Sequence, residues 1–152
     1  MTRSLAILLL LPLSVSAGEL DGKAIVCYSA IDDEAGAMPE GWVFDDGKAL
    51  PQVISTRKGG TVAVIVGPAE LNPTPEYYVA EIDSVHWDYD REWVLNRKTL
   101  ELKHYSSLDS SRLIRGYHCE LAESEASLGE IMETARREKQ KQLDEQMKDN
   151  KI

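Results

Sequence analysis

The segment 92–103, E-W-V-L-N-R-K-T-L-E-L-K, is the feature that most constrains how this chain can fold. Apolar and polar residues alternate on both sides of the short polar turn Asn96-Arg97-Lys98. Alternation with a period of two is typical of a half-buried β-strand, and a polar turn between two such runs indicates a β-hairpin. The segment therefore predicts antiparallel β structure. No catalytic signature accompanies it.

Further short strands are expected along the chain, because β-branched and alternating runs are separated by Gly, Pro and Asp-Gly turns. Asp46-Gly47 predicts a two-residue hairpin turn, since Gly accepts a positive φ. The run 61–66, T-V-A-V-I-V, is almost entirely apolar and is predicted to be the most buried strand. The expected strands are 23–30, 41–44, 49–55, 61–66, 77–89 with a bulge, 92–96, 99–103 and 113–121.

Residues 1–17 have the features of a secretory signal peptide. Arg3 precedes the apolar run 5–13, and Val15-Ser16-Ala17 supplies the small residues that a signal peptidase requires. The apolar run is shorter than the roughly 20 residues of a membrane-spanning helix. We therefore predict cleavage after Ala17, export to the periplasm or the extracellular space, and no stable membrane insertion of the cleaved chain.

The chain has two cysteines, Cys27 and Cys119, and both lie in expected strands. In an exported protein two cysteines predict one disulfide, with two free buried thiols or a metal pair as the alternatives. A Cys27–Cys119 bond would join the first strand to the last. Such a bond favours a curled sheet or a small barrel over an open meander, because closure also removes exposed strand edges.

The character of the sequence changes after Leu121, and residues 124–152 are expected to form a C-terminal helix that Ser124 or Ser127 caps. Its first turns carry an apolar stripe, whereas its second half is charged with both signs. We expect the first two turns to pack on the sheet and the remainder to project or fray. The stripe consists of Leu128, Ile131, Met132 and Ala135.

Together these elements predict a mainly β fold: an antiparallel curled sheet or small barrel of about eight short strands, with one C-terminal α-helix. Three segments are predicted along the chain. They are a signal peptide over 1–17, a disulfide-stapled antiparallel β domain over 18–123, and a charged amphipathic helix over 124–152.

The net charge of −9 at pH 7 excludes some classes of partner. An acidic domain of this size is repelled by the phosphate backbone of nucleic acids and by anionic lipid headgroups. We therefore predict no nucleic-acid partner. Basic proteins or cations are electrostatically easier for this chain to bind.

The three histidines are the natural candidates for metal or acid–base chemistry, but their spacing matches no zinc motif. His86 with Asp88, and His118 with Glu120, are each expected on a strand face that points away from the core. If those two strands are neighbours, the four side chains form a surface cation site. Solvated or strand-pairing histidines are the alternative, and we predict no catalytic residues and no cofactor.

Two motifs carry a resemblance to other proteins. W-V-L-N-R-K-T-L-E-L at 93–102 and Y-H-C-E-L at 117–121 are followed by a charged helix and a Lys-Ile terminus. In these features the chain resembles small exported bacterial proteins of unassigned function, over residues 87–152 best. The resemblance implies an exported domain and assigns no activity or functional residues.

From the residues we expect a non-enzymatic periplasmic or secreted binding module for a protein or cell-envelope component. Its basis is the export signal, the single disulfide and the acidic and proline-rich loops. The alternative is a carrier of a small apolar ligand, held in a β-barrel cavity. An enzyme such as a hydrolase is a third hypothesis, which requires a cleft with perturbed carboxylates or histidines.

Overall fold

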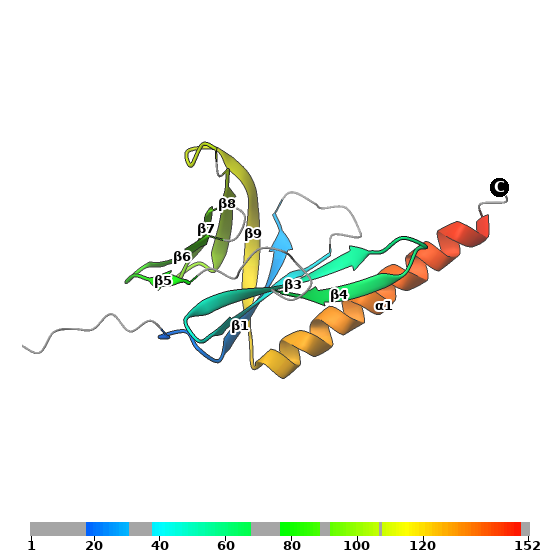
Figure 1. The fold of residues 1–152 in the computed structure, drawn as a ribbon, viewed down its shortest axis with the longest axis horizontal. Coiled ribbons are helices and arrows are strands. Elements are labelled where there is room, and N and C mark those ends of the chain that lie inside the picture. The colour runs from blue at the N-terminus through cyan, green and yellow to red at the C-terminus, as the bar shows by residue number, and fades with distance from the viewer. Residues whose placement is uncertain (1–17, 31–37, 68–76, 89–91, 107, 150–152) are drawn as a thin grey trace, which may run out of the picture.

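A computed structural model describes residues 18–30, 38–67, 77–88, 92–106 and 108–149 (Figure 1). The predicted signal peptide, residues 1–17, lies outside the described part of the chain. The described residues form nine antiparallel strands and one helix. The elements are β1 (Lys23–Ser29), β2 (Glu40–Asp45), β3 (Lys48–Thr56), β4 (Val62–Val66), β5 (Val79–Ala80), β6 (Ser84–Asp88), β7 (Glu92–Asn96), β8 (Glu101–Tyr105), β9 (Leu113–Ala122) and α1 (Glu125–Asp149).

All nine strands belong to one sheet in the order β4-β3-β2-β1-β9-β8-β7-β6-β5. The first and last strands, β1 and β9, are therefore neighbours at its centre. The sheet is curled but not closed into a barrel, and the mainly β fold with one C-terminal helix is confirmed. The extra strand arises because the predicted segment 77–89 forms two strands, β5 and β6, in place of one bulged strand.

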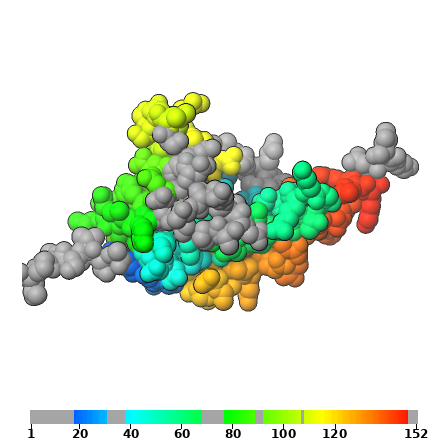
Figure 2. All heavy atoms as spheres, viewed as in Figure 1, coloured from blue at the N-terminus to red at the C-terminus, as the bar shows by residue number. Residues whose placement is uncertain are grey.

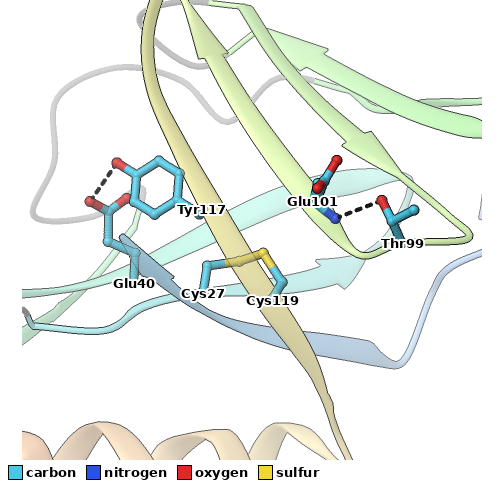
Figure 3. Close-up of a disulfide and its surroundings, with 6 residues drawn as sticks. All are labelled: Cys27, Glu40, Thr99, Glu101, Tyr117 and Cys119. Atoms are coloured by element: carbon cyan, nitrogen blue, oxygen red, sulfur yellow. Dashed lines mark hydrogen bonds between the residues drawn. A yellow bond between two sulfur atoms is a disulfide. The ribbon is translucent and has the colours of Figure 1, made fainter. Parts of the chain in front are cut away.

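The disulfide between Cys27 and Cys119 is present at the centre of the sheet (Figure 3). The two cysteines face each other in the β1–β9 register, with their Cα atoms 4.0 Å apart. The bond spans a sequence separation of 92 residues. It therefore links the two ends of the β domain.

The inner face of the sheet, the concave one, holds an aromatic core. Trp42 of β2 packs edge-on against Trp93 of β7, with ring centroids 5.0 Å apart. Phe44 of β2 packs in the same way against Tyr78, which precedes β5, at 5.4 Å. Strands far apart in the sheet order therefore meet, because the sheet folds over on itself. Figure 1 shows β6 to β8 rising steeply from the plane of β1 to β4.

The outer face carries a second core beneath α1. Leu128 and Met132 of the helix are fully buried against Ala24, Val26 and Val43. The start of α1 is a reciprocal capping box, since the Ser127 N–H donates to Ser124 Oγ at 3.1 Å and the Ser124 N–H to Ser127 Oγ at 2.9 Å. The sequence predicted this helix and its serine cap.

The second half of α1 does not project, and that prediction is wrong. Gln140 Oε1 accepts a hydrogen bond from the Val62 N–H at 2.8 Å, and Gln140 Nε2 donates to the Gly60 carbonyl at 3.0 Å. The helix lies along the β3–β4 hairpin in Figures 1 and 2, where the teal hairpin meets the orange-red end of α1. A polar side chain makes this contact, so an apolar periodicity cannot predict it.

The strand β4 is also not the most buried strand, contrary to expectation. It is the last strand at one edge of the sheet, and Val66 is 48 % exposed. The most buried strand is β1, in which the four residues Ala24, Ile25, Val26 and Cys27 are almost fully buried, and it has a neighbouring strand on both sides. Apolar composition alone does not distinguish an edge strand from a central one, because burial depends on strand order.

The hairpin turns follow the predicted chemistry with one difference. Asp46 and Gly47 have φ values of 49° and 69°, as a two-residue turn between antiparallel strands requires. In the 92–103 hairpin, β8 begins at Glu101 and not at Thr99, because Leu100 has a φ of 55° and leaves the extended conformation. The hairpin itself is present.

Candidate functional site

The structure does not bring the four predicted surface-site residues together. His86 and Asp88 lie on β6, and His118 and Glu120 lie on β9. Two strands, β7 and β8, separate β6 from β9, which places the two pairs roughly 14 Å apart in a sheet. Within the described ranges, no group of three or more His, Cys, Asp or Glu side chains is placed to hold a metal ion.

His86 has a local partner instead. Its Nε2 atom lies 2.8 Å from Ser84 Oγ on the same strand and 3.8 Å from the Glu81 carboxylate. The side chain is thus part of a surface network at one end of the sheet, as the solvated alternative expects.

A partly buried acid–phenol pair lies beside the disulfide on the inner face. The Tyr117 hydroxyl donates to Glu40 Oε1 at 3.0 Å, which connects β9 to β2 across β1 (Figure 3). Burial raises the pKa of the Glu40 carboxyl, and the Tyr117 hydrogen bond and the Arg115 charge oppose that effect. Burial and the nearby Glu40 charge also raise the pKa of Tyr117. Sequence reasoning missed Glu40, because its partial burial and its contact with Tyr117 depend on strand order.

A groove of about 690 Å³ opens on the outer face, between α1 and the β1–β9 pair. Its floor is apolar and comes from four separate parts of the chain. Tyr28 on β1 is 39 % exposed and Leu121 at the end of β9 is 65 % exposed, so both present apolar surface to solvent. The apolar lining consists of Tyr28, Met38, Pro39, Leu121, Ala122, Ile131 and Ala135.

The rim of this groove is acidic. Glu123, Glu130 and Glu138 line it together with the hydroxyl side chains Ser127 and Thr134. All three glutamates are exposed, and none forms an ion pair with another described residue. Burial first, and then the Glu120 charge, raise the pKa of Tyr28 at one end of the groove. The groove therefore combines an apolar floor with a negative potential.

The arrangement follows from the way α1 uses its apolar stripe. Leu128 and Met132 face the sheet and are buried, whereas Ile131 and Ala135, on the flank of the same stripe, line the groove. The sequence signal for this surface was the width of the apolar stripe, which has more residues than the contact with the sheet buries. Leu121 also lines the groove, although it lies opposite Ile25 of the inner core in the β1–β9 register and alternation assigns it to that face with Cys119.

Comparison of the chain with protein-family models, with curated proteins and with solved structures found no match. The structure alone therefore defines the class: a curled nine-stranded antiparallel sheet, joined at its centre by a disulfide and covered on its outer face by one long helix. No helix in the described ranges is both long and apolar enough to cross a membrane.

Proposed function

We propose that this chain is an exported, non-enzymatic binding module, and that the groove between α1 and β9 takes an apolar, positively charged segment of a partner protein. The observation that carries the proposal is the exposed apolar floor bounded by Glu123, Glu130 and Glu138. Contiguous exposed apolar surface with a polar rim marks interaction sites on soluble proteins. Export rests on the signal sequence at residues 1–17, and a Cys27–Cys119 disulfide is compatible with an oxidising compartment.

The charge of the groove selects the chemistry of its partner. Three unpaired carboxylates around an apolar floor favour a segment in which Lys or Arg flanks Leu, Ile, Val or an aromatic residue. The net charge of −9 adds long-range attraction for a basic protein and repels acidic ones. Steering of this kind weakens as salt concentration increases.

Two other hypotheses have less support. A small-ligand carrier needs an empty interior, but rings of Trp42, Phe44, Trp87 and Trp93 pack against one another on the inner face. An enzyme needs a perturbed acid in a cleft, and the Glu40 carboxyl with its raised pKa does not line the groove. Its hydrogen bond to Tyr117 suits a structural contact between strands.

A fluorescence-anisotropy titration tests the proposal. The probes are two labelled peptides of equal length, one with alternating Leu and Lys and one with Leu and Glu. We expect saturable binding of the Lys peptide only. The triple variant Glu123→Gln, Glu130→Gln, Glu138→Gln should weaken that binding by roughly tenfold or more, because each lost charge pair contributes to affinity.

A matched control removes three charges elsewhere. The variant Glu81→Gln, Asp83→Asn, Asp88→Asn makes the same change in net charge near β5 and β6, away from the groove residues. It should bind the Lys peptide nearly as well as the unaltered chain. Equal loss in both triple variants would mean that net charge alone attracts the peptide, and the groove would not be the site.

A further inference from the structure

The two edges of the sheet differ in how they are protected from pairing with other strands. The edge strand β5 has only two residues. The other edge strand, β4, has five residues, V-A-V-I-V, and carries no charged side chain. Natural sheets protect edges with short strands, charges or covering elements, because an open apolar edge pairs with other chains. The edge at β4 therefore requires a covering element or a partner.

The hydrogen-bond pattern shows which backbone groups of β4 point outward. The Arg57 N–H donates to the Thr61 carbonyl at 2.8 Å, and the Gly67 N–H donates to the Pro51 carbonyl at 2.9 Å. Odd-numbered residues of this stretch thus bond toward β3. Bonding direction alternates along an antiparallel strand, so Val62, Val64 and Val66 direct their N–H and C=O groups to the free edge.

The helix covers only one of these three residues. Gln140 accepts from the Val62 N–H at 2.8 Å, and Arg136 donates to the Val62 carbonyl at 3.3 Å. No described residue forms a hydrogen bond with the outward groups of Val64 or Val66. A shallow groove lined by Val64, Val66, Gly129 and Glu133 lies beside this uncovered end. Because the helix occupies the outward groups of Val62, the part of this edge that is open to another strand consists of Val64 to Val66.

We propose that the β4 edge pairs with the β4 edge of a second copy of this chain, which forms an antiparallel dimer about a two-fold axis at Ile65. In this register Val64 exchanges both hydrogen bonds with Val66 of the second copy, and Val66 with its Val64. The Val62 groups keep their contacts with Gln140 and Arg136. An identical edge can pair with itself only in this isologous, antiparallel way within a closed dimer.

The spacing of the outward groups favours a second copy over an unrelated strand, because Val64 and Val66 can each serve as the other's partner across a two-fold axis. The helix runs antiparallel to β4, with Glu125 and Glu133 beside the Val64–Val66 end and Gln140 beside Val62. A two-fold axis at Ile65 places the acidic start of each helix toward the second half of the other, which carries both signs in equal number. The charged residues of 137–149 are Arg137, Lys139, Lys141 and Lys148 against Glu138, Asp144, Glu145 and Asp149.

Light scattering of the purified chain, coupled to size-exclusion chromatography, measures the proposed dimer. The interface is small, so we expect a dissociation constant on the order of micromolar and a mass that rises with loading concentration. Val66→Lys should raise that constant by roughly tenfold or more, since it places a charge at the paired edge. Val66 is half exposed, so this variant should fold normally.

The matched control is Val79→Lys, which adds the same charge at the other edge of the sheet, where Val79 is 57 % exposed. It should dimerise like the unaltered chain. Hydrogen exchange supplies a second readout, because the Val64 and Val66 amides should exchange slowly in the dimer and quickly in Val66→Lys. A single-chain mass at every concentration, or equal effects of the two lysine variants, would overturn the proposal.

Discussion

The rings of Trp42 and Trp87 lie with their centroids 5.1 Å apart, although four strands, β1, β9, β8 and β7, stand between their own strands β2 and β6. In a flat sheet, strands five positions apart would be separated by about 24 Å. The short distance between these two rings therefore shows that the sheet is strongly curled. The contact also fills the inner face with aromatic packing.

Trp42→Ala should be the most destabilising change in the inner core. Trp42 is 1 % exposed and contacts the rings of both Trp87 and Trp93. Removing a buried Trp leaves a cavity and costs about 3–5 kcal/mol. Urea unfolding followed by tryptophan fluorescence measures the loss. Leu108→Ala, at a position 97 % exposed, is the control and should stay within about 0.5 kcal/mol of the unaltered chain.

Reduction of the Cys27–Cys119 bond should destabilise the chain without changing its fold. In the chain-entropy model, a bond across a sequence separation of 92 lowers the entropy of the unfolded chain and so raises the free energy of unfolding by about 4–5 kcal/mol. Both cysteines are also buried between paired strands, which persist without the bond. Unfolding with and without a reductant measures the difference. The same denaturation midpoint in both conditions would contradict this expectation.

Gly41→Ala should weaken the packing of α1 on the sheet. A Cβ atom at Gly41 would lie 3.0 Å from Leu128 Cδ1 and 3.3 Å from the Gln52 Cβ, so these side chains must shift by a few tenths of an ångström. Overpacking of this kind costs about 1–3 kcal/mol. Gly116→Ala is the matched control, because a Cβ there meets no atom within 4 Å. We expect thermal unfolding to show a lower midpoint temperature for Gly41→Ala and an unchanged midpoint temperature for Gly116→Ala.

Glu40→Gln should stabilise the chain at neutral pH. The folded-state pKa of Glu40 is raised by burial above its ordinary 4.5, so the folded protein favours the protonated acid. The contribution of the neutral Glu40 carboxyl to the free energy of unfolding is fully present below the ordinary pKa. It is lost as the pH rises through the raised pKa of the folded state. The Gln variant cannot ionise and keeps an acceptor for the Tyr117 hydroxyl.

The measurement is the free energy of unfolding of both proteins as a function of pH. Their difference should be near zero in acid and should grow as pH rises above 4.5. Tyr117→Phe removes the hydroxyl that lowers the Glu40 pKa, so it should shift this transition to higher pH. A difference that is constant across the pH range would contradict the assignment to Glu40.

Local patterns in the sequence predicted much of this fold. The Asp46-Gly47 turn, the 92–103 hairpin, the serine cap of α1 and the Cys27–Cys119 bond were all correct, because each depends on neighbouring residues or on a unique pair. The edge position of β4 and the docking of Gln140 were not predicted. Both depend on strand order, which periodicity does not encode.

The candidate sites show the same division. The two halves of the predicted histidine site were placed correctly on separate strands, but β7 and β8 lie between them. The groove residues were seen only in part, as the Ile131 and Ala135 flank of the helix stripe. Leu121 joins them because the end of β9 runs directly into α1, and this geometry is tertiary.

Site-specific photocrosslinking tests the proposed binding function most directly. A photoreactive residue at Leu121, in the groove, is compared with one at Leu113, which is also exposed at the opposite end of β9. In exporting cells, we expect Leu121 to yield a discrete crosslink to a basic protein and Leu113 to yield none. No crosslink at Leu121, or the same crosslinks at both positions, would contradict the assignment of the groove as the binding site.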